Sequence, residues 1–153
     1  MIEMFSIKNL RNPHWTNRNK LIGETMMDPN KTVLDLGCGA KDLLRYYTPT
    51  RYLGVDIAVT ADIQINFDND FELPAGWDYV VNSGILEYID DPAKYLKRIS
   101  TLGNEYIFTW WPGIGQGRMT NERMKEEFIQ QYYDIVYETY WGPQLVVKCT
   151  PKR

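Results

Sequence analysis

The chain has 153 residues, of which 44% are apolar and 24% are charged, so it fits one globular domain with room for a real core. Its formal net charge of −3 excludes a general electrostatic attraction to nucleic acid or to an anionic membrane. Two distant cysteines, Cys38 and Cys149, exclude a disulfide framework, and with a single histidine they cannot form a standard zinc site.

The N-terminal residues 1–30 are predicted to form a helical segment ahead of the main body of the domain. A short helix is expected over 15–27, ended by "DPN". Arg11, Arg18 and Lys20 cluster here, and the pattern favours a solvated helix face over a basic binding patch. No stretch has the apolar length of a signal-peptide core or a membrane span, so we expect a cytoplasmic protein in a reducing compartment.

Residues 31–153 alternate between short apolar runs and helical segments. Strands are predicted at 32–36, 51–57, 61–67, 77–83 and 105–111, and a terminal hairpin at 135–141 and 144–150. Helices are predicted at 41–47, 91–101 and 120–133, with Asp91 and Thr120 as N-caps. The second and third strands lie too close in sequence for a crossover helix. This order predicts one α/β domain, 1–153, with a mostly parallel sheet and a C-terminal antiparallel hairpin.

The first strand runs into a glycine turn, "VLDLGCGAKDL". Gly37 and Gly39 flank Cys38, and such a turn can bring the backbone close to a ligand. A dinucleotide fingerprint would place its third glycine at Asp42, and no phosphate-loop sequence follows. Asp42 would repel a pyrophosphate, whereas Asp35, two residues before the first glycine, favours a cationic group. The turn therefore predicts a cofactor with a cationic end.

Asp56 ends the second predicted strand, about 20 residues after the first glycine. An acidic side chain at that position can accept hydrogen bonds from both ribose hydroxyls of a nucleotide cofactor. An aspartate that merely starts a loop is the alternative. The glycine turn upstream favours the cofactor interpretation, because the carboxyl ends of parallel strands meet at one edge of the sheet.

Three segments together resemble a known family. They are "VLDLGCGAKDL" (33–43), "YLGVDI" (52–57) and "WDYVVNSGILEYIDDPAKYLKRI" (77–99). They are similar to the class I S-adenosylmethionine-dependent methyltransferases, and with the terminal hairpin the resemblance spans most of the chain. It implies a Rossmann-like three-layer sandwich and methyl transfer from S-adenosylmethionine.

The resemblance also implies roles for individual residues. The glycine turn and its preceding acid would hold the methionine part of the cofactor, and here these are Asp35, Gly37, Cys38 and Gly39. Asp56, with Ile57 after it, would meet the ribose. Asp68 would meet the adenine amino group, with Asp70 as the weaker alternative. The stretch beside the sulfonium and the adenine edge begins with Asn82 and Ser83.

The sequence departs from the family pattern at three points. Lys41 stands where the common third glycine of GxGxG would fall, and Tyr88 stands where many members carry histidine. The helix that usually separates the second and third strands is missing. These departures, and the short chain, motivate an alternative function: a cofactor-binding or degenerate domain with a regulatory or interaction role and no turnover.

The acceptor side of the site is less defined. A general base is needed only if the nucleophile arrives protonated, and the candidates are Glu87, Tyr88 and His14. Glu87 could equally brace the loop, and a lone histidine beside Trp15, such as His14, is more often a packing or surface residue.

The loop at 109–119 carries Trp110 and Trp111, and it is either a packed aromatic pair on a flexible connector or a mobile lid over the acceptor. Tyr88, Trp110 and Trp111 are the candidate contacts for the acceptor. Arg118 would pair with an anionic acceptor or lie on the surface. We expect a small-molecule acceptor, no nucleic acid, no membrane partner and no metal; the oligomeric state stays open.

Overall fold

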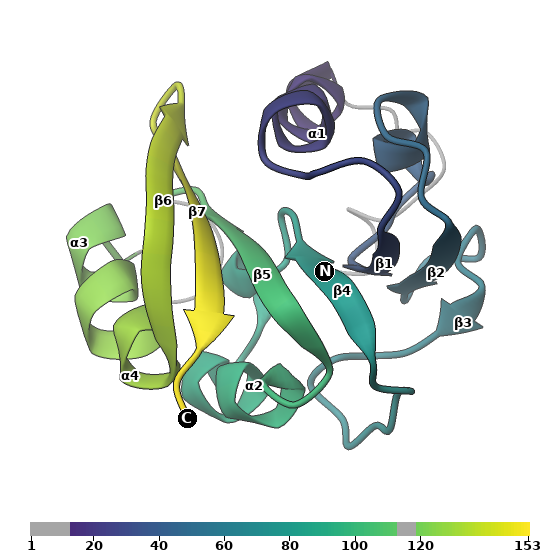
Figure 1. Ribbon diagram of the computed structural model, residues 1–153. Coiled ribbons are helices and arrows are strands. Elements are labelled where there is room, and N and C mark those ends of the chain that lie inside the picture. Colours follow the sequence, from purple (N-terminus) through teal and green to yellow (C-terminus); the bar gives the residue numbers. More distant parts are fainter. Residues whose placement is uncertain (1–12, 113–118) are drawn as a thin grey trace.

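The computed structural model describes residues 13–112 and 119–153, with side chains from residue 17 onward. The described strands form one seven-stranded sheet in the order β3-β2-β1-β4-β5-β7-β6 (Figure 1). Their bounds are β1 (Thr32–Leu36), β2 (Arg51–Asp56), β3 (Ile63–Gln64), β4 (Trp77–Asn82), β5 (Gly103–Trp110), β6 (Tyr133–Trp141) and β7 (Gln144–Pro151). The first five strands pair in parallel, and β7 runs antiparallel to both β5 and β6. The predicted mixed sheet is confirmed.

Helical segments cover both faces of this sheet, as the three-layer prediction requires (Figure 1). In chain order they are α1 (Pro13–Thr25), η3 (Asp42–Arg45), η4 (Leu86–Tyr88), α2 (Pro92–Ile99), α3 (Asn121–Arg123), η5 (Met124–Ile129) and α4 (Gln130–Tyr132). Two apolar clusters form because side chains alternate along each strand. Val80 packs with the cluster under α2 and η5, whereas Tyr79 and Val81 pack with the cluster under α1 and η3.

The expected N-caps are present. The Asp91 side chain accepts a hydrogen bond from the backbone N–H of Lys94 at 3.1 Å, with Pro92 as the first helical residue. Thr120 Oγ1 accepts one from the backbone N–H of Arg123 at 3.2 Å. Each cap satisfies an N–H that the first helical turn leaves without a partner.

Some elements are shorter or less regular than the sequence pattern predicts. The expected strand at 61–67 contributes only the two residues of β3, which pair with β2 alone at the edge of the sheet. Its apolar side chains still pack against the core, so the alternation reported burial rather than strand pairing. The expected helix at 41–47 is a single 3-10 turn, and the last helix contains a π segment, η5.

The carboxyl ends of β1, β2 and β4 meet at one edge of the sheet. In the strand order β2 lies on one side of β1 and β4 lies on the other. The connections therefore diverge above β1, which creates the topological switch point where ligands bind in open α/β sheets. Among the described residues, no helix is both long and apolar enough to cross a membrane.

Candidate active site

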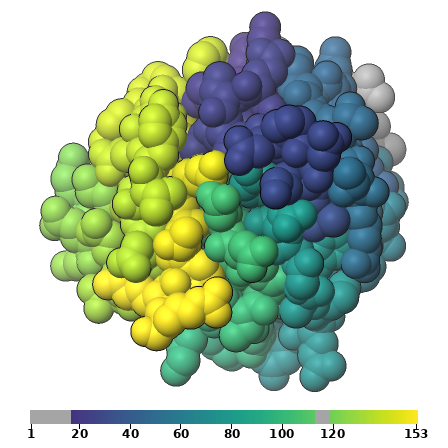
Figure 2. Space-filling view, viewed as in Figure 1, coloured from purple at the N-terminus to yellow at the C-terminus, as the bar shows by residue number. Residues whose placement is uncertain are grey.

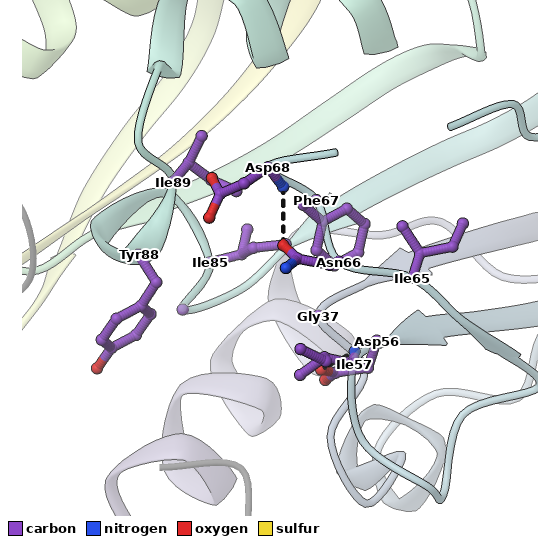
Figure 3. Close-up of a pocket in the computed structure, with 11 residues that line it drawn as sticks. Gly37, Asp56, Ile57, Ile65, Asn66, Phe67, Asp68, Ile85, Tyr88 and Ile89 are labelled. Atoms are coloured by element: carbon purple, nitrogen blue, oxygen red, sulfur yellow. Dashed lines mark hydrogen bonds between the residues drawn. The ribbon is translucent and has the colours of Figure 1, made fainter. Parts of the chain in front are cut away.

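Two adjoining pockets open at this switch point. The first, here called the apolar pocket, has an empty volume of about 360 Å³ and is shown in Figure 3. It is lined by Gly37, Asp56, Ile57, Ile65, Asn66, Phe67, Asp68, Gly84, Ile85, Tyr88 and Ile89. The second, the polar pocket, has an empty volume of about 380 Å³. It is lined by Arg18, Asn19, Gly37, Cys38, Gly39, Ala40, Asp42, Asp56, Ser83 and Gly84. Shared walls at Gly37, Asp56 and Gly84 make the two pockets one continuous site.

The glycine turn forms the divide between the two pockets. Gly37 has φ of +79°, and a β-carbon there would lie 3.3 Å from Cβ of Ile85 on the facing wall. The backbone N–H groups of Gly37 and Cys38 both donate to the carbonyl oxygen of Val55, which ties the turn to β2. Glycine at 37 thus keeps the passage between the pockets open and tolerates the left-handed backbone.

Asp56 lies at the junction and is only 2% exposed. Its Oδ2 accepts a hydrogen bond from the Gly39 N–H at 2.7 Å, and its Oδ1 accepts from the N–H groups of Ile57 and Ala58 at 2.6 and 3.3 Å. Burial raises the pKa of Asp56, and these three hydrogen bonds oppose that rise. A carboxylate has about four acceptor sites, so Oδ2 keeps one for a ligand hydroxyl.

Asp68 lies at the far end of the apolar pocket. Its Oδ1 accepts a hydrogen bond from the Asp90 N–H at 2.9 Å, and its own N–H donates to Asn66 Oδ1 at 3.0 Å (Figure 3). The side chain of Asp70 is 84% exposed and pairs with Arg98 at 2.7 Å, outside the pocket. Of the two acids considered for the adenine amino group, the geometry favours Asp68.

Arg18 lines the polar pocket, and the sequence pattern did not indicate it as a site residue. The expectation of a solvated side chain is wrong for Arg18, which is 3% exposed, although Lys20 is exposed as predicted and Arg11 lies outside the described residues. A signal existed in the sequence: Arg18 lies four residues before Ile22, so both share one helix face, and Ile22 is fully buried. The helix therefore carries its arginine into the molecule.

The guanidinium of Arg18 joins three parts of the fold. Its Nε donates to Ser83 Oγ at 2.7 Å, and its Nη1 donates to Gln144 Oε1 at 2.8 Å. No residue in the described part of the chain accepts a hydrogen bond from Nη2. A β-carbon at Gly84 would lie 2.4 Å from Nη2, so glycine is required there for Arg18 to fit. Burial lowers the pKa of Arg18 and nearby Glu87 opposes this; arginine nonetheless stays charged.

Figure 2 shows the N-terminal segment that carries α1 packed between two other parts of the molecule. The N-terminal segment, in purple and dark blue, lies against the yellow-green C-terminal hairpin on one side and the blue residues after β1 on the other. Arg18 of α1 donates hydrogen bonds to Ser83, which follows β4, and to Gln144 of β7. The polar pocket is therefore complete only when α1 is docked.

Two residues expected to touch the cofactor lie behind the pocket walls. Asp35 Oδ2 accepts a hydrogen bond from the Tyr52 hydroxyl at 2.7 Å, and burial raises the pKa of Asp35 to about 7. Asn82 points to the other face of the sheet, where its Oδ1 accepts a hydrogen bond from the Tyr95 hydroxyl at 2.6 Å. Neither lines a pocket, whereas the expected Gly37, Cys38, Gly39, Asp56, Ile57, Asp68 and Ser83 all do.

The acceptor-side candidates divide into packed and accessible residues. Trp110 is 1% exposed in the core, and its Nε1 donates to the carbonyl oxygen of Met119 at 2.9 Å. Glu87 is equally buried, and its Oε1 accepts from the Trp111 N–H at 2.8 Å. These contacts favour packing for Trp110 and bracing of the loop for Glu87.

Tyr88 is the accessible member of this group. It lines the apolar pocket, and its ring points away from the other labelled side chains in Figure 3. Trp111 is partly buried at the start of the loop. His14 belongs to α1, but its side chain lies outside the described residues, as does Arg118. Within the described ranges no cluster of three potential metal ligands is present.

Comparison with protein families decides the class of this site. Residues 10–105 match the family model described as a methyltransferase domain. The chain belongs to the methyltransferase domain family. Comparison with curated proteins finds no match.

Solved structures share the fold of this methyltransferase. A chain from a Haloferax volcanii complex containing the Trm112 methyltransferase activator has a TM-score of 0.74 at 14% identity, covering 96% of this chain and 93% of that one. A SAM-dependent methyltransferase from Aquifex aeolicus has a TM-score of 0.72 at 16% sequence identity, and the match covers 95% of this chain and 97% of that one. The N-methyltransferase NodS from Bradyrhizobium japonicum, in complex with S-adenosylhomocysteine, has a TM-score of 0.67 at 12% sequence identity. The match covers 94% of this chain and 90% of that one. The predicted family and fold are confirmed.

Proposed function

We propose that this methyltransferase transfers the methyl group of S-adenosylmethionine to a small-molecule acceptor. The observation that carries the proposal is the pair of adjoining pockets, one apolar and one charged, that meet at Asp56. S-adenosylmethionine has matching parts in the same order: a flat base for the apolar pocket, a ribose diol for Asp56 and a zwitterionic amino-acid tail for the charged pocket. Relatives in this fold class described as SAM-dependent or solved with S-adenosylhomocysteine support the choice of cofactor.

The residues present fit this cofactor part by part. The isoleucines of the apolar pocket and Phe67 would enclose the adenine, with Asp68 at its polar edge. Asp56 would accept a hydrogen bond from a ribose hydroxyl through Oδ2. In the polar pocket Arg18 would pair with the carboxylate of the tail, because its Nη2 has no acceptor among the described residues. Asp42, which is 8% exposed and lines the same pocket, would balance the ammonium.

The cofactor supplies a methyl group that its positive sulfur already activates. The protein then has to orient two molecules and keep water away, and holding nucleophile and methyl carbon about 3–3.5 Å apart accounts for much of the acceleration. Gly37 and Gly84 leave the space between the pockets free of side chains. Glu87 is braced against Trp111 rather than aimed into either pocket. Glu87 is therefore not assigned as a general base, and an acceptor that arrives deprotonated needs none.

A small-molecule acceptor fits the net charge of −3, which does not attract nucleic acid. One neighbour of the same fold is the Burkholderia thailandensis 1,6-didemethyltoxoflavin-N1-methyltransferase, solved with bound 1,6-didemethyltoxoflavin. Tyr88 at the rim of the apolar pocket is our proposed contact for the acceptor. A cytoplasmic location remains a prediction.

Calorimetric titration with S-adenosylhomocysteine tests the cofactor assignment. The chain should bind it in the micromolar range, and Asp56→Ala should weaken binding at least tenfold while the fold is retained, since a buried hydrogen-bonding group is lost. Asp70→Ala is the matched control, because that acid is exposed and outside the pockets. No heat at concentrations well above micromolar would overturn the assignment.

Turnover distinguishes the enzyme from a degenerate domain. The expected result is methyl transfer to at least one member of a small-molecule acceptor panel. Binding of the cofactor product without transfer would favour the regulatory alternative. The panel should also be repeated with a Trm112-type activator added, since a chain of the same fold comes from a Haloferax volcanii complex with that activator.

A further inference from the structure

The connection between β2 and β3, residues 57–62, replaces the helix usual at this point and touches the glycine turn along its length. The Gly39 N–H donates to Asp56 Oδ2 at 2.7 Å, and the Gly39 carbonyl oxygen accepts from Thr60 Oγ1 at 2.6 Å. Two residues further on, Lys41 Nζ lies 2.6 Å from Asp62 Oδ1. The turn is thus tied to the last residue of β2 and to the middle and the end of the connection that follows it.

Lys41 has an unusual backbone. Its φ is +62° and its ψ is +37°, the left-handed region, which is strained for a residue with a side chain. This explains why glycine suits the third position of a GxGxG turn. The chain keeps lysine there, and the side chain reaches Asp62, whose other oxygen accepts from the Gly54 N–H at 2.8 Å. The Lys41 hydrogen bond, with that of Gly54, lowers the pKa of Asp62 and keeps it ionised.

We infer that residues 57–62 clamp the glycine turn in the shape that the cofactor requires, and that Lys41 and Asp62 are the positioning residues of this clamp. Gly39, Ala40 and Asp42 surround Lys41 in the sequence and line the polar pocket, so a shift of Lys41 moves the pocket wall. The clamp takes over the fixing of the turn that a glycine-rich sequence and a following crossover helix would provide. This inference rests on the proposed function for its effect on cofactor binding.

The test is a double-mutant cycle with Lys41→Met and Asp62→Asn. Methionine keeps an unbranched stem without the charge, and asparagine keeps an oxygen for the Gly54 N–H. Each single variant should raise the dissociation constant of S-adenosylhomocysteine about two- to fivefold, the range for one exposed ion pair, and the double variant should be no worse than either single. The difference from wild type should shrink in 1 M salt. Unchanged affinity, or effects that multiply, would overturn the inference.

Two further variants separate the clamp from simple backbone strain. Lys41→Gly removes the strain as well as the ion pair, so the clamp predicts weaker binding, whereas strain alone predicts binding as good as wild type or better. Arg123→Met breaks a surface ion pair of the same 2.6 Å length on α3, far from the pockets, and should leave affinity unchanged.

A readout without ligand keeps this test independent of the proposed function. Amide hydrogen exchange at Gly39 and Lys41 should speed up about two- to fivefold in Lys41→Met and Asp62→Asn, since a tie that holds the turn closed is lost. Equal exchange in wild type and both variants would overturn the clamp. If wild type fails to bind S-adenosylhomocysteine while exchange changes as expected, the proposed function falls and the clamp stands.

Discussion

The apolar pocket and the polar pocket share one edge of the sheet but differ in where their walls originate. The apolar pocket is built by Gly37, by residues 56–57 at the end of β2, by residues 65–68 after β3 and by residues 84–89 after β4. The polar pocket adds Arg18 and Asn19 from α1. Arg18 is fixed by hydrogen bonds to residues 65 and 126 positions away in the sequence. One half of the site is thus local, and the other depends on the docking of a remote helix.

This difference divides recognition into two physical parts. The apolar pocket binds by removing a flat ring from water, which depends on shape and area. The polar pocket binds by charge, and a buried arginine whose Nη2 has no hydrogen-bond acceptor among the described residues gains a strong hydrogen bond when a carboxylate enters. Binding of a ligand that lacks the amino-acid tail should therefore be insensitive to changes in α1.

The largest expected effect concerns Asp35, the acid buried behind the polar pocket. Burial raises its pKa from 3.8 to about 7, so folding favours the protonated form. The protonated Asp35 stabilises the folded state fully below about pH 4, and this stabilisation is lost as the pH rises to 7. Over that range the free energy of unfolding should fall by up to about 4 kcal/mol. Asp35→Asn should remove that part of the pH dependence and raise stability at pH 8. Urea unfolding at pH 5 and pH 8 measures both.

Tyr52→Phe supplies the control for this prediction. The Tyr52 hydroxyl donates to Asp35 and lowers its pKa, so its removal should move the pH window upward without abolishing it. Nearby Asp56 raises the pKa of Asp35 and Lys41 lowers it. An Asp35→Asn variant with the same loss of stability between pH 5 and pH 8 as wild type would show that Asp35 is ionised in the folded protein.

The next effect in size is the removal of Arg18. Arg18→Met should weaken S-adenosylhomocysteine binding about 10- to 100-fold, because a hydrogen bond to a charged group contributes about 1.5–3 kcal/mol. Binding of 5′-methylthioadenosine, which lacks the amino-acid tail, should change less than threefold. Calorimetric titration of both ligands measures the two halves of the site separately.

Lys20→Met on the same helix is the matched control for Arg18→Met, since Lys20 is exposed and outside both pockets. It should leave both affinities unchanged. An equal loss of affinity for both ligands in Arg18→Met would mean that α1 supports the whole site, and the division into a local and a remote half would be wrong.

The same division explains how far the sequence could go. Asp56 and Asp68 were predictable because acids at or just after strand ends gather at one edge of a parallel sheet. Arg18 was not found, since a helical period places it on the face of Ile22 but does not say that the face packs beside Ser83 and Gln144. Such a contact between distant segments is set by tertiary docking, which no local pattern encodes.

Residues placed by strand alternation were harder still. Asp35 and Asn82 follow the family pattern in sequence, yet their side chains point to opposite faces of the sheet and pair with Tyr52 and Tyr95. Strand length was also unpredictable at the edge, because β3 has only β2 as a partner. The order of the strands and the three layers were predictable, since they follow from the alternation of elements along the whole chain.

The smallest effect distinguishes two neighbouring acids in the apolar half. Asp68→Asn should weaken both S-adenosylhomocysteine and 5′-methylthioadenosine about fivefold, as expected for one hydrogen bond of about 1 kcal/mol to the base that both ligands carry. Asp70→Asn should change neither, because its exposed carboxylate pairs with Arg98 and Lys94 outside the pocket. The two variants remove the same charge two residues apart, so long-range electrostatics are matched. A loss of affinity in Asp70→Asn alone would move the adenine contact from Asp68 to Asp70.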